Sequence, residues 1–163
     1  MSTLEQWLAQ RGSGMALALD NYREPICGTV STRLATSYPT LCYDSSRADA
    51  LAFQQHTYHE TPRRFHRLLQ VLLHFQSIEV IEREYRWGWP VLQRHGVKSH
   101  HLLAQVQFYF EAAHSHLIFE DLDRTQLDEL ETAILQIITQ VTHTPTAAQA
   151  NGHLNGNGFH PHK

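Results

Sequence analysis

The stretch REYRWGWPVLQRHGV, residues 83–97, decides how the second half of this chain is interpreted. It contains two of the three tryptophans, Trp87 and Trp89, which flank a glycine directly before Pro90. Because proline lacks an amide hydrogen and disfavours helical geometry at the residue before it, the spacing predicts a bend there. Gly96 then stands where a helix commonly ends in a left-handed conformation. The stretch therefore predicts a helix, a bend and a tight corner between two long packed helices.

The residues before this stretch also carry helical spacing. Ser2 and Glu5 form a capping-box pattern that predicts the start of a first helix, and a second, short helix is predicted over residues 15–22. Residues 25–45 mix β-branched residues, serines and a proline, and they are interpreted as a short helix between turns. A further helix is expected to open at the serines in positions 45 and 46.

The clearest helical patterns follow residue 60. Thr61 and Pro62 are interpreted as the cap and first residue of a central buried helix, because a helix start does not need proline's missing amide hydrogen. Ser99 is expected to cap a following helix, and Asp123 with Gln126 resembles another capping box. The last helix has one apolar stripe, formed by Leu127, Leu130, Ile134, Ile137, Ile138 and Val141.

These patterns predict an all-α protein with a single helical domain over residues 1–144. Residues 145–163 are polar and rich in Gly and Asn, a composition that cannot offset its own ordering entropy, so a disordered polar tail is predicted there. The size of 163 residues, with 42% hydrophobic and 18% charged residues, suits one globular domain.

Composition also narrows the class of protein. A net charge of −3 and the lack of a basic stripe argue against nucleic acid as a partner. Neither a membrane-spanning apolar run nor a signal-peptide pattern occurs, so we expect a cytoplasmic protein with no membrane partner. The two cysteines, Cys27 and Cys42, form no CxxC pattern, and neither a zinc module nor a disulfide scaffold is predicted.

Motifs for catalysis and metal binding are weak. The sequence has no phosphate-binding glycine loop and no G-x-S-x-G elbow, and the chain is predicted not to be an enzyme. Glu111-x-x-His114 is half of a di-iron site, whose second half is missing, and His56-x-x-His59-Glu60 lacks the order of a zinc-protease motif. Both are interpreted as chance occurrences in a chain with 13 histidines, and no metal site is predicted.

The order of these helices resembles a known superfamily. A buried helix, the VLQRHGV corner, the capped segment SHHLLAQVQFYFEAA and the amphipathic segment TQLDELETAILQIITQ are similar to the second half of globins, and more closely to their phycobiliprotein branch. The likeness covers residues 61–142. The chain length also suits allophycocyanin-like subunits and the bilin-biosynthesis-associated globins of cyanobacteria. The resemblance implies a globin-like fold, a tetrapyrrole ligand, a homodimer, and a bilin-pathway protein as a partner.

The resemblance implies a noncovalent ligand rather than a covalent one. Phycobiliproteins attach their bilin to a cysteine at the start of the helix that matches residues 62–76, but this chain has no cysteine after Cys42. Arg63, Arg64 and Arg67 match the region where related proteins pair arginines with propionates, and arginine suits bidentate carboxylate recognition. The alternative is a solvated basic helix start, the usual state of exposed charge.

Haem is the other ligand that the resemblance implies, and it needs an axial imidazole. The proximal position falls near Val91, which cannot ligate iron, while His95 lies one turn later and His66 lies near the distal position. A five-coordinate haem held by His95 is therefore one hypothesis. The alternative is that both histidines are ordinary residues satisfied by hydrogen bonds.

Two functions from different classes remain. In the first, the protein is a carrier or sensor that holds a bilin or haem noncovalently in the cleft between the helix from Pro62 and the helix over 78–89, with Tyr85, Trp87 and Trp89 as flat apolar walls. In the second, those aromatics fill the space, and a cofactor-free signalling or adaptor protein acts through dimerisation, as in cofactorless globin-like stress-sensor domains. Packing at a corner is the commoner role for such tryptophans.

Overall fold

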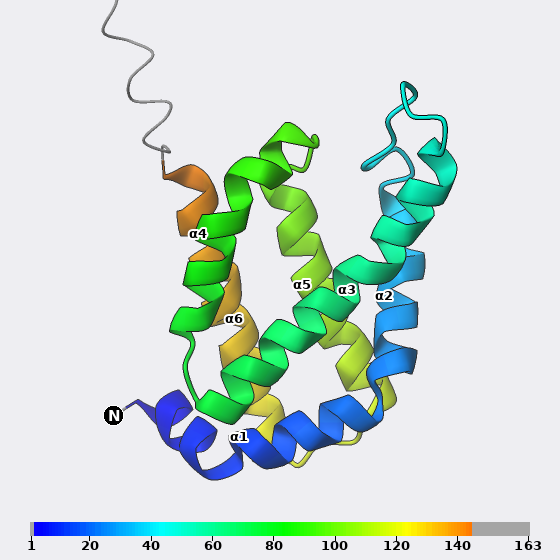
Figure 1. Cartoon of the computed structure of the whole chain (residues 1–163). Helices are drawn as coiled ribbons and strands as arrows, with labels where there is room; N and C mark the ends of the chain where they lie inside the picture. The colour runs from blue at the N-terminus through cyan, green and yellow to red at the C-terminus, as the bar shows by residue number, and fades with distance from the viewer. Residues whose placement is uncertain (1, 145–163) are drawn as a thin grey trace, which may run out of the picture.

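Residues 2–144 of the chain are described by a computed structural model, and this part is all-helical, as predicted (Figure 1). It contains no strand, and its six helices are α1 (Thr3–Asn21), α2 (Arg23–Ser37), α3 (Ala50–Phe75), α4 (Glu79–Arg94), α5 (Ser99–His116) and α6 (Asp121–His143). The predicted disordered tail lies outside the described residues. None of these helices combines the length and the apolar character needed to cross a lipid bilayer.

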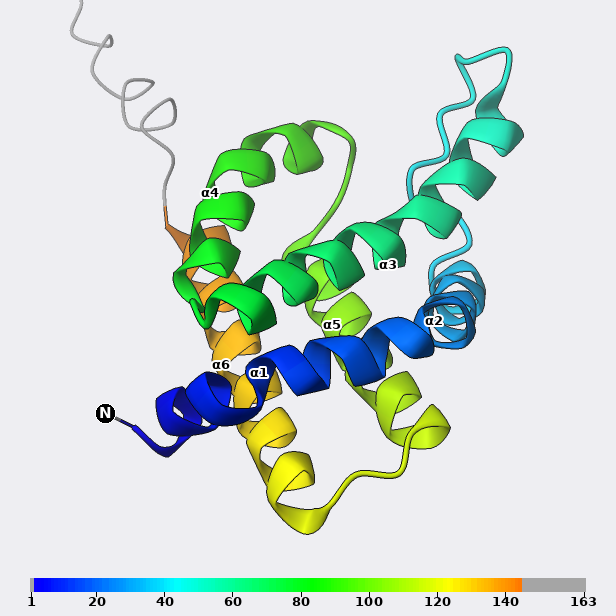
Figure 2. The ribbon, with the colours of Figure 1, turned by 60° about the horizontal axis from the view of Figure 1, so that its bottom comes forward.

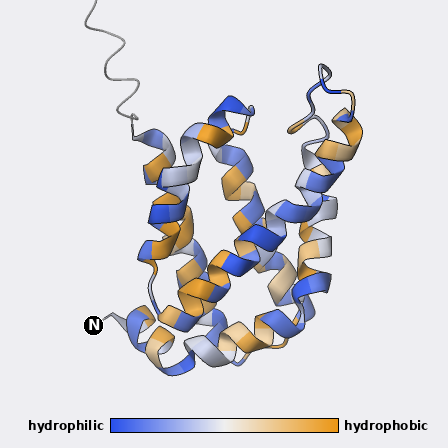
Figure 3. Cartoon of the chain, in the orientation of Figure 1, coloured by the Kyte–Doolittle hydropathy of each residue, from blue (hydrophilic) through white to orange (hydrophobic). Residues whose placement is uncertain are grey.

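The six helices cross one another around a single cluster of buried side chains. In Figure 1, α3 runs diagonally in front of α5, with α4 and α6 on one side and α2 on the other. Figure 2 shows α1 crossing in front of α5 and α6, next to α3. Hydrophobic and hydrophilic residues alternate along the helices (Figure 3). Buried hydrophobic side chains from all six helices form the core cluster. Leu69, Leu72 and Leu73 of α3 have no exposed surface.

The first helix is longer than predicted. The capping box at its start is confirmed, because Ser2 Oγ accepts a hydrogen bond from the Glu5 amide and the Glu5 carboxylate accepts one from the Ser2 amide. The separate helix predicted over residues 15–22 is wrong, since α1 continues through both of its glycines. Gly12 has a packing role there: an added Cβ would lie 2.5 Å from the Leu73 carbonyl oxygen of α3.

The interpretation of Pro62 as a helix start is also wrong. α3 begins at Ala50, so the helix expected to open at positions 45 and 46 and the central helix are one, with Pro62 inside it. A proline leaves the carbonyl four residues earlier without its helical donor. That carbonyl belongs to Tyr58, and it accepts a hydrogen bond from Ser31 Oγ of α2 at 2.8 Å. A contact between helices thus replaces the lost helical bond.

Residues 83–97 form one helix and then a corner. α4 continues past Gly88 and contains Pro90, so both tryptophans lie on one helix and Pro90 does not separate two helices. The corner at Gly96 is confirmed: its φ is 79°, and its amide donates to the Gln93 carbonyl at 3.1 Å. The Val97 amide donates to the Leu92 carbonyl at 3.1 Å, which completes a Schellman motif.

The last two helices begin close to their predicted starts, but their caps differ. α5 starts at Ser99 with Lys98 as its cap residue. Asp123, predicted as the cap of the last helix, lies inside α6 and is 4% exposed. Its carboxylate accepts hydrogen bonds from Trp7 Nε1 at 2.8 Å and from Arg11 Nη2 at 2.5 Å. These bonds hold the pKa of Asp123 below its usual value, so the carboxylate ties α6 to α1.

Candidate functional site

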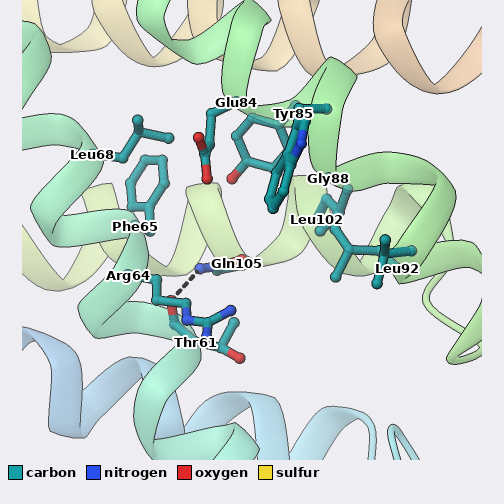
Figure 4. A pocket seen from close by; sticks show the side chains of 12 residues that line it. Thr61, Arg64, Phe65, Leu68, Glu84, Tyr85, Gly88, Leu92, Leu102 and Gln105 are labelled. Atoms are coloured by element: carbon teal, nitrogen blue, oxygen red, sulfur yellow. Dashed lines mark hydrogen bonds between the residues drawn. The ribbon is translucent and has the colours of Figure 1, made fainter.

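A largely apolar groove lies between α3, α4 and α5, and it is the candidate functional site (Figure 4). Its volume of about 300 Å³ is at the small end of the range for ligand pockets. The groove is lined by Thr61, Arg64, Phe65, Leu68, Glu84, Tyr85, Trp87, Gly88, Val91, Leu92, Leu102 and Gln105.

Helical spacing explains why these residues meet. Three of the α3 residues, Thr61, Phe65 and Leu68, are spaced by four and then three positions, so they share one face of that helix. Glu84, Gly88 and Val91 have the same spacing on α4. From α5, Leu102 and Gln105 close the groove, and the Gln105 amide donates to the Thr61 carbonyl at 2.9 Å. This hydrogen bond fixes α5 to α3 beside the groove (Figure 4).

The polar groups of the groove are few and largely unpaired. Arg64 is exposed, and within residues 2–144 it forms no ion pair, unlike Arg63 and Arg67 beside it. Tyr85 is 8% exposed, and in Figure 4 its hydroxyl faces the space between Glu84, Phe65 and Gln105. Burial, aided by the nearby charge of Glu84, raises the pKa of Tyr85, so this phenol stays protonated and can donate a hydrogen bond.

The structure brings together three of the eight residues predicted for a ligand site, namely Arg64, Tyr85 and Trp87. The other two arginines do not line the groove. Arg63 pairs with Glu24 of α2 at 2.5 Å and donates to the His59 carbonyl at 2.6 Å. Arg67 has 61% of its side chain exposed and lies 3.8 Å from Glu60. The predicted set of three propionate-binding arginines is therefore reduced to one within the groove.

His66 lies outside the groove because it points into the core between α1 and α5. Its Nδ1 lies 2.6 Å from the Tyr109 hydroxyl and its Nε2 lies 3.0 Å from Asp20 Oδ1. Burial lowers the pKa of His66, and the bond to Asp20 opposes that effect only in part. A neutral ring that accepts from Tyr109 and donates to Asp20 satisfies all three groups. Both ring nitrogens are thus occupied, and neither is free to face a ligand.

His95 and Trp89 also lie apart from the groove. His95 caps the end of α4 and borders a different surface hollow, together with Tyr38, Cys42 and His101. Trp89 is 5% exposed and belongs to the buried core, whereas Trp87 is 76% exposed at the groove. Two tryptophans only two positions apart therefore have different roles, because residues two positions apart on a helix point to nearly opposite sides.

Most of the residues that line the groove were not predicted from the sequence. The helical spacing of Thr61, Phe65 and Leu68 was a usable signal, because it placed them on the same face as Arg64. Gln105 gave no such signal. Its position beside the groove depends on how α5 crosses α3, which a single helix pattern does not specify.

The described residues contain no group of three or more His, Cys, Asp and Glu side chains placed to hold a metal ion. The residues of the Glu111-x-x-His114 motif have separate partners: Glu111 pairs with Arg33, and His114 Nε2 lies 3.0 Å from Asp128 Oδ1.

Cys27 is buried, and burial raises the pKa of its thiol to about 11. Such a thiol stays protonated and is a poor nucleophile at neutral pH.

Fold and groove together define an all-helical domain with a small apolar groove between three helices, whose polar lining includes Arg64, Glu84 and the hydroxyl of Tyr85. In comparisons with known proteins, no protein family, no curated protein and no solved structure matches the chain.

Proposed function

We propose that this chain is a globin-like carrier or sensor that holds a tetrapyrrole noncovalently in the groove between α3, α4 and α5. In this proposal it is a cytoplasmic binding protein linked to bilin metabolism, and it is not an enzyme. The observation that carries the proposal is the combination of an apolar groove with an unpaired arginine, Arg64, at its edge. Such a groove suits a flat apolar molecule with a carboxylate.

The packing of the helices supports the globin-like part of this proposal. α2 packs against both α3 and α5, α6 packs against α4 and α5, and α1 lies across α3 and α6. The globin fold likewise packs helices in crossing pairs around a ligand pocket. The resemblance places the ligand between the helices that correspond to α3 and α4, and the groove lies there.

The lining of the groove favours a linear tetrapyrrole over haem. Haem needs an axial ligand from the protein, and histidine supplies it in globins. None of the residues that line the groove is a histidine, and His66 has both ring nitrogens engaged elsewhere. A bilin needs no such ligand. Its propionate would pair with Arg64, and the exposed ring of Trp87 offers a flat surface for stacking.

Titration with biliverdin tests this proposal, with absorption and tryptophan fluorescence as the readouts. Wild-type protein should bind the pigment, and Arg64→Ala should weaken binding by roughly tenfold or more, because a hydrogen bond to a charged group contributes about 1.5–3 kcal/mol. Arg67→Ala is the matched control, since Arg67 lies on the same helix outside the groove lining, and it should leave the affinity unchanged. A wild-type protein that does not bind biliverdin, or equal losses in both variants, would contradict the proposal.

A second candidate function is favoured by the apolar surface beside the groove. Trp87 is 76% exposed and Val91 is 43% exposed, one turn apart on α4. Exposed aromatic side chains are enriched at protein interfaces. In this alternative the protein is a cofactor-free signalling or adaptor protein, and this surface of α4 forms the contact of a homodimer. Sedimentation equilibrium would favour this function if the ligand-free protein is a dimer that Trp87→Ala converts to a monomer.

A further inference from the structure

Tyr85 lines the groove, and its hydroxyl has no hydrogen-bond partner within residues 2–144. The residue is 8% exposed, so more than nine-tenths of it is covered by neighbouring side chains. Its hydroxyl faces the groove (Figure 4). The hydroxyl oxygen is not among the fully buried unpaired polar atoms of residues 2–144, so a molecule that enters the groove can reach it. A polar atom of this kind forms its hydrogen bond with water or with a ligand.

The neighbouring polar groups indicate which kind of ligand atom would reach Tyr85. A ligand N–H or O–H group would find a stronger acceptor in the carboxylate of Glu84, which lines the same groove. A ligand oxygen needs a hydrogen-bond donor, and few donors in the groove are open to it. Gln105 already donates its amide to Thr61 at 2.9 Å, and Arg64 is exposed at the edge of the groove. The indole N–H of Trp87 belongs to a side chain that is 76% exposed. The protonated phenol of Tyr85 is therefore the unpaired donor on a mostly buried lining residue that can meet an oxygen entering the groove.

We infer that Tyr85 determines the specificity of this groove, by donating its hydroxyl to a carbonyl oxygen in the apolar part of a flat carboxylate ligand whose acid group pairs with Arg64. The inference rests on the proposed function only in taking the groove as a ligand site, and it extends that function by naming the second polar group of the ligand. A ligand without the carbonyl would displace water from the hydroxyl and return no hydrogen bond, so it would bind less tightly.

Two probes of the same shape separate this role from simple packing. Fluorenone-2-carboxylate and fluorene-2-carboxylate are flat, apolar acids that differ only in a carbonyl group against a methylene group. Their dissociation constants would be measured by calorimetric titration. Wild-type protein should prefer the fluorenone acid by about tenfold, the ratio that one neutral hydrogen bond of ordinary strength supplies.

Tyr85→Phe keeps the aromatic ring and removes only the hydroxyl. In this variant the two probes should bind equally, with the loss confined to the fluorenone acid. Arg64→Ala should weaken both probes by the same factor and keep the preference. Tyr43→Phe, at an exposed tyrosine outside the groove, is the matched control and should behave as wild type. Melting temperatures should show that Tyr85→Phe is folded, because the hydroxyl has no protein partner to lose.

Three outcomes would overturn the inference: neither probe binds to wild-type protein, both bind with equal affinity, or the preference persists in Tyr85→Phe. The biliverdin titration distinguishes this failure from that of the proposed function. A protein that ignores biliverdin but prefers the fluorenone acid through Tyr85 would refute the tetrapyrrole proposal and uphold the role of Tyr85. A protein that binds biliverdin equally well before and after Tyr85→Phe would uphold the tetrapyrrole proposal and refute the role of Tyr85.

Discussion

The two sides of α3 are packed in opposite ways. On the side of α1, the helices approach so closely that a Cβ at Gly12 would lie 2.5 Å from the Leu73 carbonyl oxygen. On the side of α4, Phe65 and Tyr85 line a groove of about 300 Å³. A glycine allows two helix backbones to approach closely, because it has no side chain. Aromatic rings hold two helices apart, and a space remains between the helices where no other side chain fills it.

The polar groups of the two sides differ in the same way. On the closed side, His66 of α3 is hydrogen-bonded to Tyr109 and to Asp20, so its polar atoms are satisfied within the protein. On the open side, Arg64 and the Tyr85 hydroxyl have no partner among the described residues. The side of α3 that faces α1 therefore contributes to stability, whereas the side that faces α4 keeps polar groups without a protein partner.

The largest difference between the two sides of α3 is expected in the free energy of unfolding when one leucine on each side is replaced by alanine. Leu72 has no exposed surface, and Leu72→Ala should lower the free energy of unfolding by about 2–5 kcal/mol, because it removes buried methyl groups and leaves a cavity. Leu68 is partly exposed at the groove, and Leu68→Ala should cost about 1 kcal/mol or less. Urea unfolding followed by circular dichroism measures both. Equal losses would show that the groove side is as tightly packed as the core.

Replacing glycines of α1 should have the next largest effect. Gly12→Ala forces a methyl group against the Leu73 backbone, which cannot swing aside, and should cost about 1–3 kcal/mol. Gly14 has no atom within 4 Å of an added Cβ, so Gly14→Ala should stabilise the helix by about 1 kcal/mol. Thermal unfolding of the two variants gives opposite shifts if the close approach is real. A Gly12→Ala protein as stable as wild type would rule out that contact.

The His66 network should give a smaller, pH-dependent effect. Burial lowers the pKa of folded His66 below its usual value, so the unfolded chain binds a proton more readily. Stability from this residue is therefore complete above the unfolded pKa of about 6.5 and declines as the pH falls below it. Urea unfolding of wild type and His66→Gln between pH 8 and pH 5 should show a flatter profile for the variant. Parallel profiles would mean that His66 does not titrate as the structure implies.

The smallest effect on stability is expected at Trp87. The side chain is 76% exposed, so Trp87→Ala should change the free energy of unfolding by no more than about 0.5 kcal/mol. Trp89→Ala is the contrasting variant on the same helix and should be strongly destabilising, because Trp89 is 5% exposed. Chemical unfolding measures the two variants side by side. A large loss at Trp87 would place that ring in the core rather than at the groove.

Local sequence signals located several features of the fold. The capping box of Ser2 and Glu5 and the corner at Gly96 depend on hydrogen bonds and backbone angles within a few residues, so neighbouring residues specify them. Pro62 shows where such reasoning fails. It lies inside α3, although proline is favoured at the first position of a helix and disrupts a helix interior. At Pro62 the compensation comes from Ser31, which is 31 positions away in the sequence.

The candidate site was predictable only in part, for a similar reason. The family resemblance, together with residue type, pointed to Arg64, Tyr85 and Trp87, which line the groove. The same resemblance selected Arg63 and His66, which have partners on α2, α1 and α5 instead. A spacing of one or two positions turns a side chain to a different face of the helix. Which face meets a neighbouring helix depends on how the helices cross.

Residues close together in the sequence specify that this chain is helical, where its second half turns at Gly96, and which side chains form the apolar stripes, because these properties arise from backbone preferences and periodicity over a few turns. The packing of the helices specifies that α1 lies against α3 at Gly12, that the Tyr58 carbonyl accepts a hydrogen bond from Ser31, and that Arg64 and Tyr85 share a groove. Those features join residues far apart in the chain, and their energies exist only when helices are packed together.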